Sequence, residues 1–159
     1  MNLHESIQQN SISYLCFAVG DEKFALHVAN VTSILEMQQI TTVPNCPVYM
    51  RGIINLRGTV LPVLELRTLL GMNANQITAN SCILVLDLVQ NGENTHVGML
   101  VDSVTEVFEL QPQDILTPPS LSNSTSIIGI AKRPDGFVML LEAANLIESH
   151  NTILSGIAS

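Results

Sequence analysis

An internal repeat of about 70 residues constrains the fold of this chain more than any other feature. When Phe24 is laid over Val97 without gaps, "FALHVANVTSILEM" aligns with "VGMLVDSVTEVFEL", with apolar residues facing apolar residues at most positions. Further along, "GIINLRGTVLPVLELRTLL" has a counterpart in "GIAKRPDGFVMLLEAANLI". The same order of segments in both halves indicates a duplicated structural unit.

Each copy of the repeat reads as short strands separated by turns. In the first copy, "SYLCFAV" and "FALHV" flank "GDEK" and predict a hairpin, "ANVTSILEM" predicts a corner and a strand, and "ELRTLLG" predicts a short helix closed by Gly71. In the second copy, "SCILVLDLV" predicts a strand, "QNGENT" a turn, and "QPQDILTPPSLSNSTS" a loop. Pro62 lacks a backbone N–H, so we expect it at a sheet edge or a bulge.

So few strands in each copy cannot bury both faces of an open sheet, which favours closure into a small barrel. We therefore expect an all-β fold of two barrels related by a pseudo-two-fold axis. The approximate units are residues 12–71 and 80–148, with exchange of strands between them left open, within one domain at 12–150. We expect residues 1–11 and 151–159 to be flexible termini.

Composition and charge disfavour several classes of partner. The chain carries 14 acidic and 6 basic residues, a net charge of −8, and 4% aromatic residues, which disfavours binding to nucleic acid or anionic lipid. No long uncharged apolar run and no signal-peptide pattern is present, so we predict no membrane insertion and a cytoplasmic location. The three widely spaced cysteines, Cys16, Cys46 and Cys82, are predicted to be buried apolar residues.

The stretch "RGIINLRGTVLPVLELR" places Arg51, Arg57 and Arg67, half of the basic residues, in one apolar segment. Gly58 supplies positive φ to the turn that Asn55 opens, so these two residues are structural. Turn geometry does not demand arginine, and a guanidinium offers donors suited to carboxylates or carbonyls. The residues alone are compatible with an Arg57 that is solvated, paired within the chain or used for recognition. Arg67 is predicted to pair with Glu65 or a helix end. Lys132 and Arg133 are predicted to occupy the equivalent turn of the second copy.

Catalytic and metal-binding motifs are missing from the sequence. G-x-S-x-G, the P-loop, G-x-G-x-x-G and H-E-x-x-H do not occur, and neither His27 nor His96 has a partner at a metal-ligand spacing. We therefore predict no catalytic, cofactor-binding or metal-binding residue and no cofactor. An enzyme or small-ligand binder with its site between the barrels remains a remote alternative, resting on His27, Asp87 and Asp102.

The stretch around "NLRG", together with the opening hairpin, the central strand pair and the closing strands, resembles the CheW family over about residues 12–148. This resemblance implies two five-stranded SH3-like barrels, with short helices at the corners and the C-terminus. It also implies a non-catalytic adaptor in chemosensory signal transduction. The implied partners are the helical hairpin of a chemoreceptor and the regulatory domain of a CheA-type histidine kinase. An adaptor of a non-flagellar chemosensory pathway is the alternative.

The resemblance also implies where partners bind. The groove between the barrels, carried over position by position, gives Val28, Val31, Val97, Gly98 and Val104, and Arg57 is a receptor-facing or interface-organising candidate. Helix-in-groove recognition requires such an apolar strip.

Two positions depart from the family pattern. Ser33 stands where an acidic residue is frequent, which weakens the transfer of a charge contact to that place. Glu65-Leu66-Arg67 stands where Asp-Leu-Arg is frequent.

Overall fold

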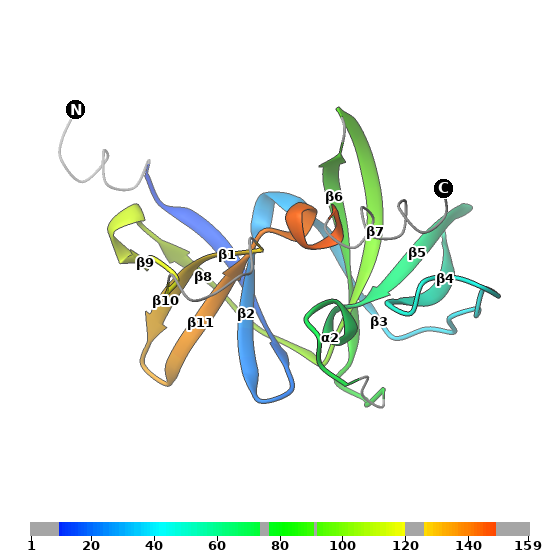
Figure 1. Ribbon diagram of the computed structural model, residues 1–159, viewed down its shortest axis with the longest axis horizontal. Helices are drawn as coiled ribbons and strands as arrows, with labels where there is room; N and C mark the ends of the chain where they lie inside the picture. The colour runs from blue at the N-terminus through cyan, green and yellow to red at the C-terminus, as the bar shows by residue number, and fades with distance from the viewer. Residues whose placement is uncertain (1–9, 74–76, 91, 120–125, 149–159) are drawn as a thin grey trace.

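The computed structural model describes residues 10–73, 77–90, 92–119 and 126–148, which form two curled β-sheets lying side by side (Figure 1). One sheet has the spatial order β8 (Ser103–Leu110), β1 (Ile12–Val19), β2 (Glu22–His27), β11 (Gly136–Leu141), β10 (Ile127–Arg133) and β9 (Ile115–Leu116). The other has the order β3 (Val31–Glu36), β6 (Cys82–Gln90), β7 (Glu93–Val101), β5 (Thr59–Glu65) and β4 (Met50–Leu56). We call them the six-stranded and the five-stranded barrel.

Short helices lie at corners and near the end of the chain. They are the 3-10 helices η1 (Val28–Asn30) and η2 (Pro112–Asp114), the α-helix α2 (Leu66–Leu69), and a helical segment at 143–148. The predicted all-β fold with short corner helices is therefore confirmed. No helix in the described part of the chain is long and apolar enough to cross a membrane.

Each barrel combines strands from both copies of the repeat. The hairpin β1–β2 of the first copy lies between β8 and β11 of the second, and the hairpin β6–β7 of the second copy lies between β3 and β5 of the first (Figure 1). The order β3-β6-β7-β5-β4 is thus the repeat-equivalent of β8-β1-β2-β11-β10. The two-residue strand β9 falls in the segment predicted to be a loop, and it gives its barrel six strands where five were expected. Its repeat-equivalent in the other barrel is the isolated bridge between Thr41 and Ile53.

The strand register follows the repeat down to its irregularities. The pairing of β3 with β6 shifts register between Val31 and Ser33, and the pairing of β8 with β1 shifts at the equivalent place, next to Val104. At each bulge a threonine hydroxyl donates to a carbonyl of the neighbouring strand at 3.1 Å, Thr32 to Val85 and Thr105 to Cys16. A bulge leaves one residue outside the ladder, and the threonine supplies a replacement hydrogen bond.

Three apolar clusters fill the molecule. The interior of the six-stranded barrel contains Tyr14, Cys16 and Phe108, and that of the five-stranded barrel contains Ile54, Leu61 and Ile83. The largest cluster, the inter-barrel core, takes side chains from β1, β2, β6 and β7 together with α2 and the helical segment 143–148. Parts of these strands, such as residues 24–26 of β2 and 97–101 of β7, are buried at every consecutive position, which explains their continuous apolar sequences.

Three local predictions are wrong. Pro62 lies on the inner strand β5 and not on an edge; the parallel ladder with β7 begins only at Val63, so a missing N–H is tolerated there. The segment "QNGENT" is mostly strand, because the antiparallel register continues to the pair Gln90–Glu93. Lys132 and Arg133 end β10, and the turn itself is made by Pro134 and Asp135.

Candidate functional site

The turn around Arg57 is tighter than the sequence suggested. Strand β4 ends at Leu56 and β5 begins at Thr59, so Arg57 and Gly58 alone form the loop, with φ values of 53° and 83°. Positive φ at both loop residues is the pattern of a type I′ hairpin turn, which favours Asn-Gly. The Asn55 Oδ1 accepts a hydrogen bond of 2.8 Å from the Gly58 amide. Arginine occupies a position where its backbone is strained.

Arg57 is also electrostatically unusual. All six basic residues lie in the described part of the chain, and four of them form ion pairs with described carboxylates. Arg57 and Lys132 have no ion-pair partner among the described residues. Arg57 therefore combines a backbone at positive φ with an exposed guanidinium that has no ion-pair partner among the described residues.

A cavity of about 390 Å³ lies beside Arg57 at the open end of the five-stranded barrel. We call it the five-strand mouth. Its lining residues are Thr32, Ser33, Leu35, Leu56, Arg57, Thr59, Leu61, Val85 and His96. The aliphatic side chains extend the barrel interior, and Arg57, His96 and the hydroxyl groups supply polarity. Reasoning from sequence did not select Ser33 or His96 as site residues, although Ser33 was noted as a departure from the family pattern.

The repeat places a second mouth on the six-stranded barrel, which we call the six-strand mouth. There the Arg133 guanidinium lies 4.3 Å from the centre of the Phe108 ring, and its Nη2 lies 3.7 Å from Glu106 Oε1. Lys23 pairs with Asp135 across the same end of the barrel. The hydrogen bond to Lys23 lowers the pKa of Asp135. The charges at this mouth are paired within the chain.

The groove candidates differ in exposure. Val28 on η1 is 37% exposed, and Val31 and Val104 are partly buried against the inter-barrel core. These three can present apolar surface to a partner.

The other two groove candidates are interior residues. Val97 is 5% exposed and belongs to the inter-barrel core. Gly98 is buried, and a Cβ there would lie 2.8 Å from Ile83 Cγ2. Because these two residues are buried, they can shape the wall of a groove from behind but offer little surface to a partner.

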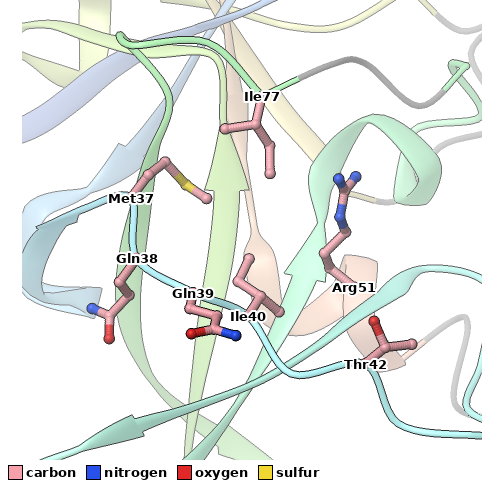
Figure 2. A pocket seen from close by; sticks show the side chains of 7 residues that line it. All are labelled: Met37, Gln38, Gln39, Ile40, Thr42, Arg51 and Ile77. Carbon is pink, nitrogen blue, oxygen red and sulfur yellow. The ribbon is translucent and has the colours of Figure 1, made fainter.

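Arg51 lies beside another hollow, of about 580 Å³. Figure 2 shows its guanidinium together with Met37, Ile40 and Ile77 around this space. Its Nη1 is 3.4 Å from Glu65 Oε2, and Glu65 is nearly buried. The charge of Arg51 is therefore already matched inside the protein.

Arg67 connects the two barrels. Its Nη2 lies 2.8 Å from Asp102 Oδ2, and the same oxygen accepts a hydrogen bond of 2.7 Å from the Gly20 amide. This contact raises the pKa of Arg67. The predicted pairing of Arg67 with Glu65 is wrong, because Glu65 lies with Arg51. Asp102 has a structural role at the corner between β7 and β8.

The polar residues of the enzyme alternative contact different partners. The ring centres of His27 and Tyr14 are 6.0 Å apart. Asp87 Oδ1 lies 3.8 Å from His96 Nε2, and Asp102 forms an ion pair with Arg67. Within the described residues, His, Cys, Asp and Glu side chains nowhere gather in threes that could hold a metal ion.

The cysteines are free thiols in two environments. Cys16 and Cys82 are buried, and burial raises the pKa of both thiols. Cys46 is only half-buried, so the prediction of burial is wrong for it; its Sγ is 3.5 Å from the Met50 carbonyl oxygen.

Two small barrels sharing one core, with an apolar groove region and a cationic mouth, define a two-barrel interaction module. The chain belongs to the CheW-like domain family, whose model matches residues 13–151.

Known proteins agree with this assignment. A probable chemotaxis protein CheW of Rhizobium etli is 32% identical over 135 residues, covering 81% of this chain and 84% of the relative. Protein FrzA of Myxococcus xanthus is 30% identical over 107 residues, covering 67% and 64%. The crystal structure of the scaffolding protein TtCheW from Thermoanaerobacter tengcongensis superposes with a TM-score of 0.75 at 28% identity, covering 85% and 91%. The SH3-like character of the two barrels is thereby confirmed.

Proposed function

We propose that this protein is a non-catalytic adaptor that couples the cytoplasmic tip of a chemoreceptor to the regulatory domain of a CheA-type histidine kinase. The observation that carries the proposal is membership of the CheW-like family over nearly the whole chain, with relatives that are chemotaxis and scaffolding proteins. The protein would act in the cytoplasm, where receptor tips and kinase meet, and would need no cofactor.

The receptor helix is proposed to lie along the apolar surface that Val28, Val31 and Val104 offer between the barrels. Val28 lies on η1 and Val31 begins β3, so the two are close in sequence, and Val31 packs against the inter-barrel core. Val97 and Gly98 would support this surface from behind. Arg57, exposed and unpaired among the described residues, would contact the receptor at the neighbouring barrel mouth. Burial of one face of an amphipathic helix is the recognition mode that fits.

Co-sedimentation tests the proposal. The protein is mixed with receptor-containing membranes and kinase, and retention in the pellet and receptor control of kinase activity are measured. We expect retention of the wild-type protein and control of the kinase. Absence of both would refute the proposed function.

Two substitutions locate the receptor contact. Val31→Lys places a charge in the groove and should reduce retention, whereas Val48→Lys, at a valine that is 86% exposed, is the matched control. Arg57→Glu should impair receptor control of the kinase while changing stability by no more than about 0.5 kcal/mol. Equal retention of Val31→Lys and Val48→Lys would place the receptor elsewhere.

The alternative is the same adaptor role in a non-flagellar chemosensory pathway. One relative, protein FrzA, is not named as a chemotaxis protein, and the similarity to it supports this alternative. Deletion of the gene separates the two. Loss of swimming chemotaxis supports the first role, and an unchanged swimming response with another altered output supports the second.

A further inference from the structure

The two barrel mouths are equivalent positions of one repeat that carry different charges. The alignment places Ser33 over Glu106, and it places Gly58 over Asp135. The two acidic residues of the six-strand mouth are therefore both replaced by uncharged residues in the five-strand mouth. The repeat thus provides an internal comparison for what each mouth can bind.

Basic groups remain in the five-strand mouth, at partly different positions. His96 stands at the position of Lys23, whereas Leu56 stands at the position of Arg133 and Arg57 adds a guanidinium one residue later, where the second copy has Pro134. In the six-strand mouth each cation has a carboxylate in the chain, since Arg133 lies beside Glu106 and Lys23 pairs with Asp135.

In the five-strand mouth the acidic neighbour of His96 is Asp87, at 3.8 Å. Arg57 has no ion-pair partner among the described residues. The guanidinium of Arg57 is therefore the group in the five-strand mouth that has no carboxylate partner among the described residues. Hydroxyl groups of Ser33 and Thr59 line the same cavity, beside the aliphatic side chains of Leu35, Leu56 and Leu61. A planar guanidinium fork at the edge of an apolar cavity suits a carboxylate, which it can bind through two parallel hydrogen bonds.

We propose that the five-strand mouth binds an Asp or Glu side chain of the chemoreceptor hairpin, and that Ser33 leaves open the place that Glu106 fills in the other mouth. This inference rests on the proposed function. The receptor is the fitting source of the carboxylate because the mouth is continuous with the proposed groove. Val31 packs against the inter-barrel core, and Ser33, two residues further along β3, lines the mouth.

The decisive variant is Ser33→Glu in the full-length protein. It restores the acid found at the equivalent position of the second copy and should pair internally with Arg57. Ser33→Gln is the matched control, since it has nearly the same size without the charge. Arg57→Gln removes the proposed donor, and Lys132→Gln removes a cation at the other barrel that likewise has no ion-pair partner in the described part of the chain. Binding to membranes containing the receptor is measured by sedimentation at two salt concentrations.

We expect Ser33→Glu and Arg57→Gln each to weaken receptor binding about tenfold, and the double variant to be no weaker than either single variant. Ser33→Gln and Lys132→Gln should bind within about twofold of wild type. On the receptor side, one acidic residue of the tip, when changed to Gln, should abolish the difference in binding between the wild-type protein and the Arg57→Gln variant. The wild-type advantage should shrink at high salt.

The outcomes separate the two claims. If the wild-type protein binds the receptor and Ser33→Glu and Arg57→Gln bind equally well, the carboxylate site is wrong and the adaptor function stands. Equal loss in Ser33→Glu and Ser33→Gln would mean that bulk and not charge matters, which also overturns the inference. If the wild-type protein does not bind the receptor, the proposed function fails, and the assignment of the mouth to a receptor carboxylate fails with it.

Discussion

The five-strand and the six-strand mouth show how one duplicated unit yields an open and a closed site. Strand order, bulge position and threonine hydrogen bond are the same in both halves. The difference lies in the side chains: Glu106 and Asp135 pair with cations of one mouth. In the other mouth Ser33 and Gly58 stand at those positions, and Arg57 has no ion-pair partner among the described residues. A duplicated barrel can therefore keep its fold while the two copies differ in how the charges at their mouths are paired.

The largest predicted effect compares two equivalent glycines at the strand bulges. A Cβ at Gly52, where φ is 155°, would lie 2.2 Å from the Thr41 carbonyl oxygen, whereas one at Gly129 would lie 2.4 Å from the Ile115 Cγ2. A backbone oxygen cannot rotate away, but an isoleucine side chain can. Gly52→Ala should lower the free energy of unfolding by about 3 kcal/mol and Gly129→Ala by about 1 to 2 kcal/mol. Urea denaturation measures both, and a loss for Gly129→Ala as large as that for Gly52→Ala would contradict this prediction.

The next effect concerns the link between the barrels. Asp102 accepts from Arg67 and from the Gly20 amide, while its repeat-equivalent Ala29 cannot. Asp102→Ala leaves a partly buried guanidinium and an amide without this acceptor and should destabilise the protein by about 2 kcal/mol. The matched control is Asp21→Ala, an exposed carboxylate in the neighbouring turn, which should have little effect. If Asp102→Ala lowers the melting temperature no more than Asp21→Ala does, Asp102 does not stabilise the contact between the barrels.

A smaller effect of opposite sign is expected at the turn of the five-strand mouth. Arg57→Asn replaces a residue strained at positive φ by one that tolerates it and should stabilise the protein by up to about 1 kcal/mol. The same change should weaken receptor binding. Arg57→Gln removes the charge without relieving the backbone and serves as the control. If Arg57→Asn and Arg57→Gln are equally stable, the positive φ of Arg57 does not destabilise the protein.

The smallest effect tests how the six-strand mouth is closed. Lys23 lowers the pKa of Asp135, so this pair contributes stability above the ordinary pKa of a carboxyl group. That contribution is lost as the pH falls through the lowered pKa of Asp135. Lys23→Gln should therefore lower the melting temperature slightly at pH 7 and no longer do so well below the ordinary carboxyl pKa of about 4. A difference between the two proteins that persists in acid would show that Lys23 acts through packing and not through charge.

Sequence alone determined the order of elements, because strand patterns, turns and the repeat are encoded by neighbouring residues. It therefore predicted two related barrels, the short helices and the structural turn at Asn55 and Gly58. It failed where one local pattern is compatible with two structures. Pro62 was expected at an edge or a bulge and lies on an inner strand, and the segment predicted as a loop after Leu110 contains the short strand β9.

Only the tertiary structure decided which charges are matched. Arg67 meets Asp102 and Arg51 meets Glu65 across distances in sequence that no local pattern encodes. The five-strand mouth is assembled in the same way, because Ser33, Arg57 and His96 come from three different segments. Folding brings such groups together through burial of apolar surface, which fixes the strands but leaves the residues at the barrel ends free to differ. The sequence therefore specifies two equal barrels, and the packed structure distinguishes the open mouth from the closed one.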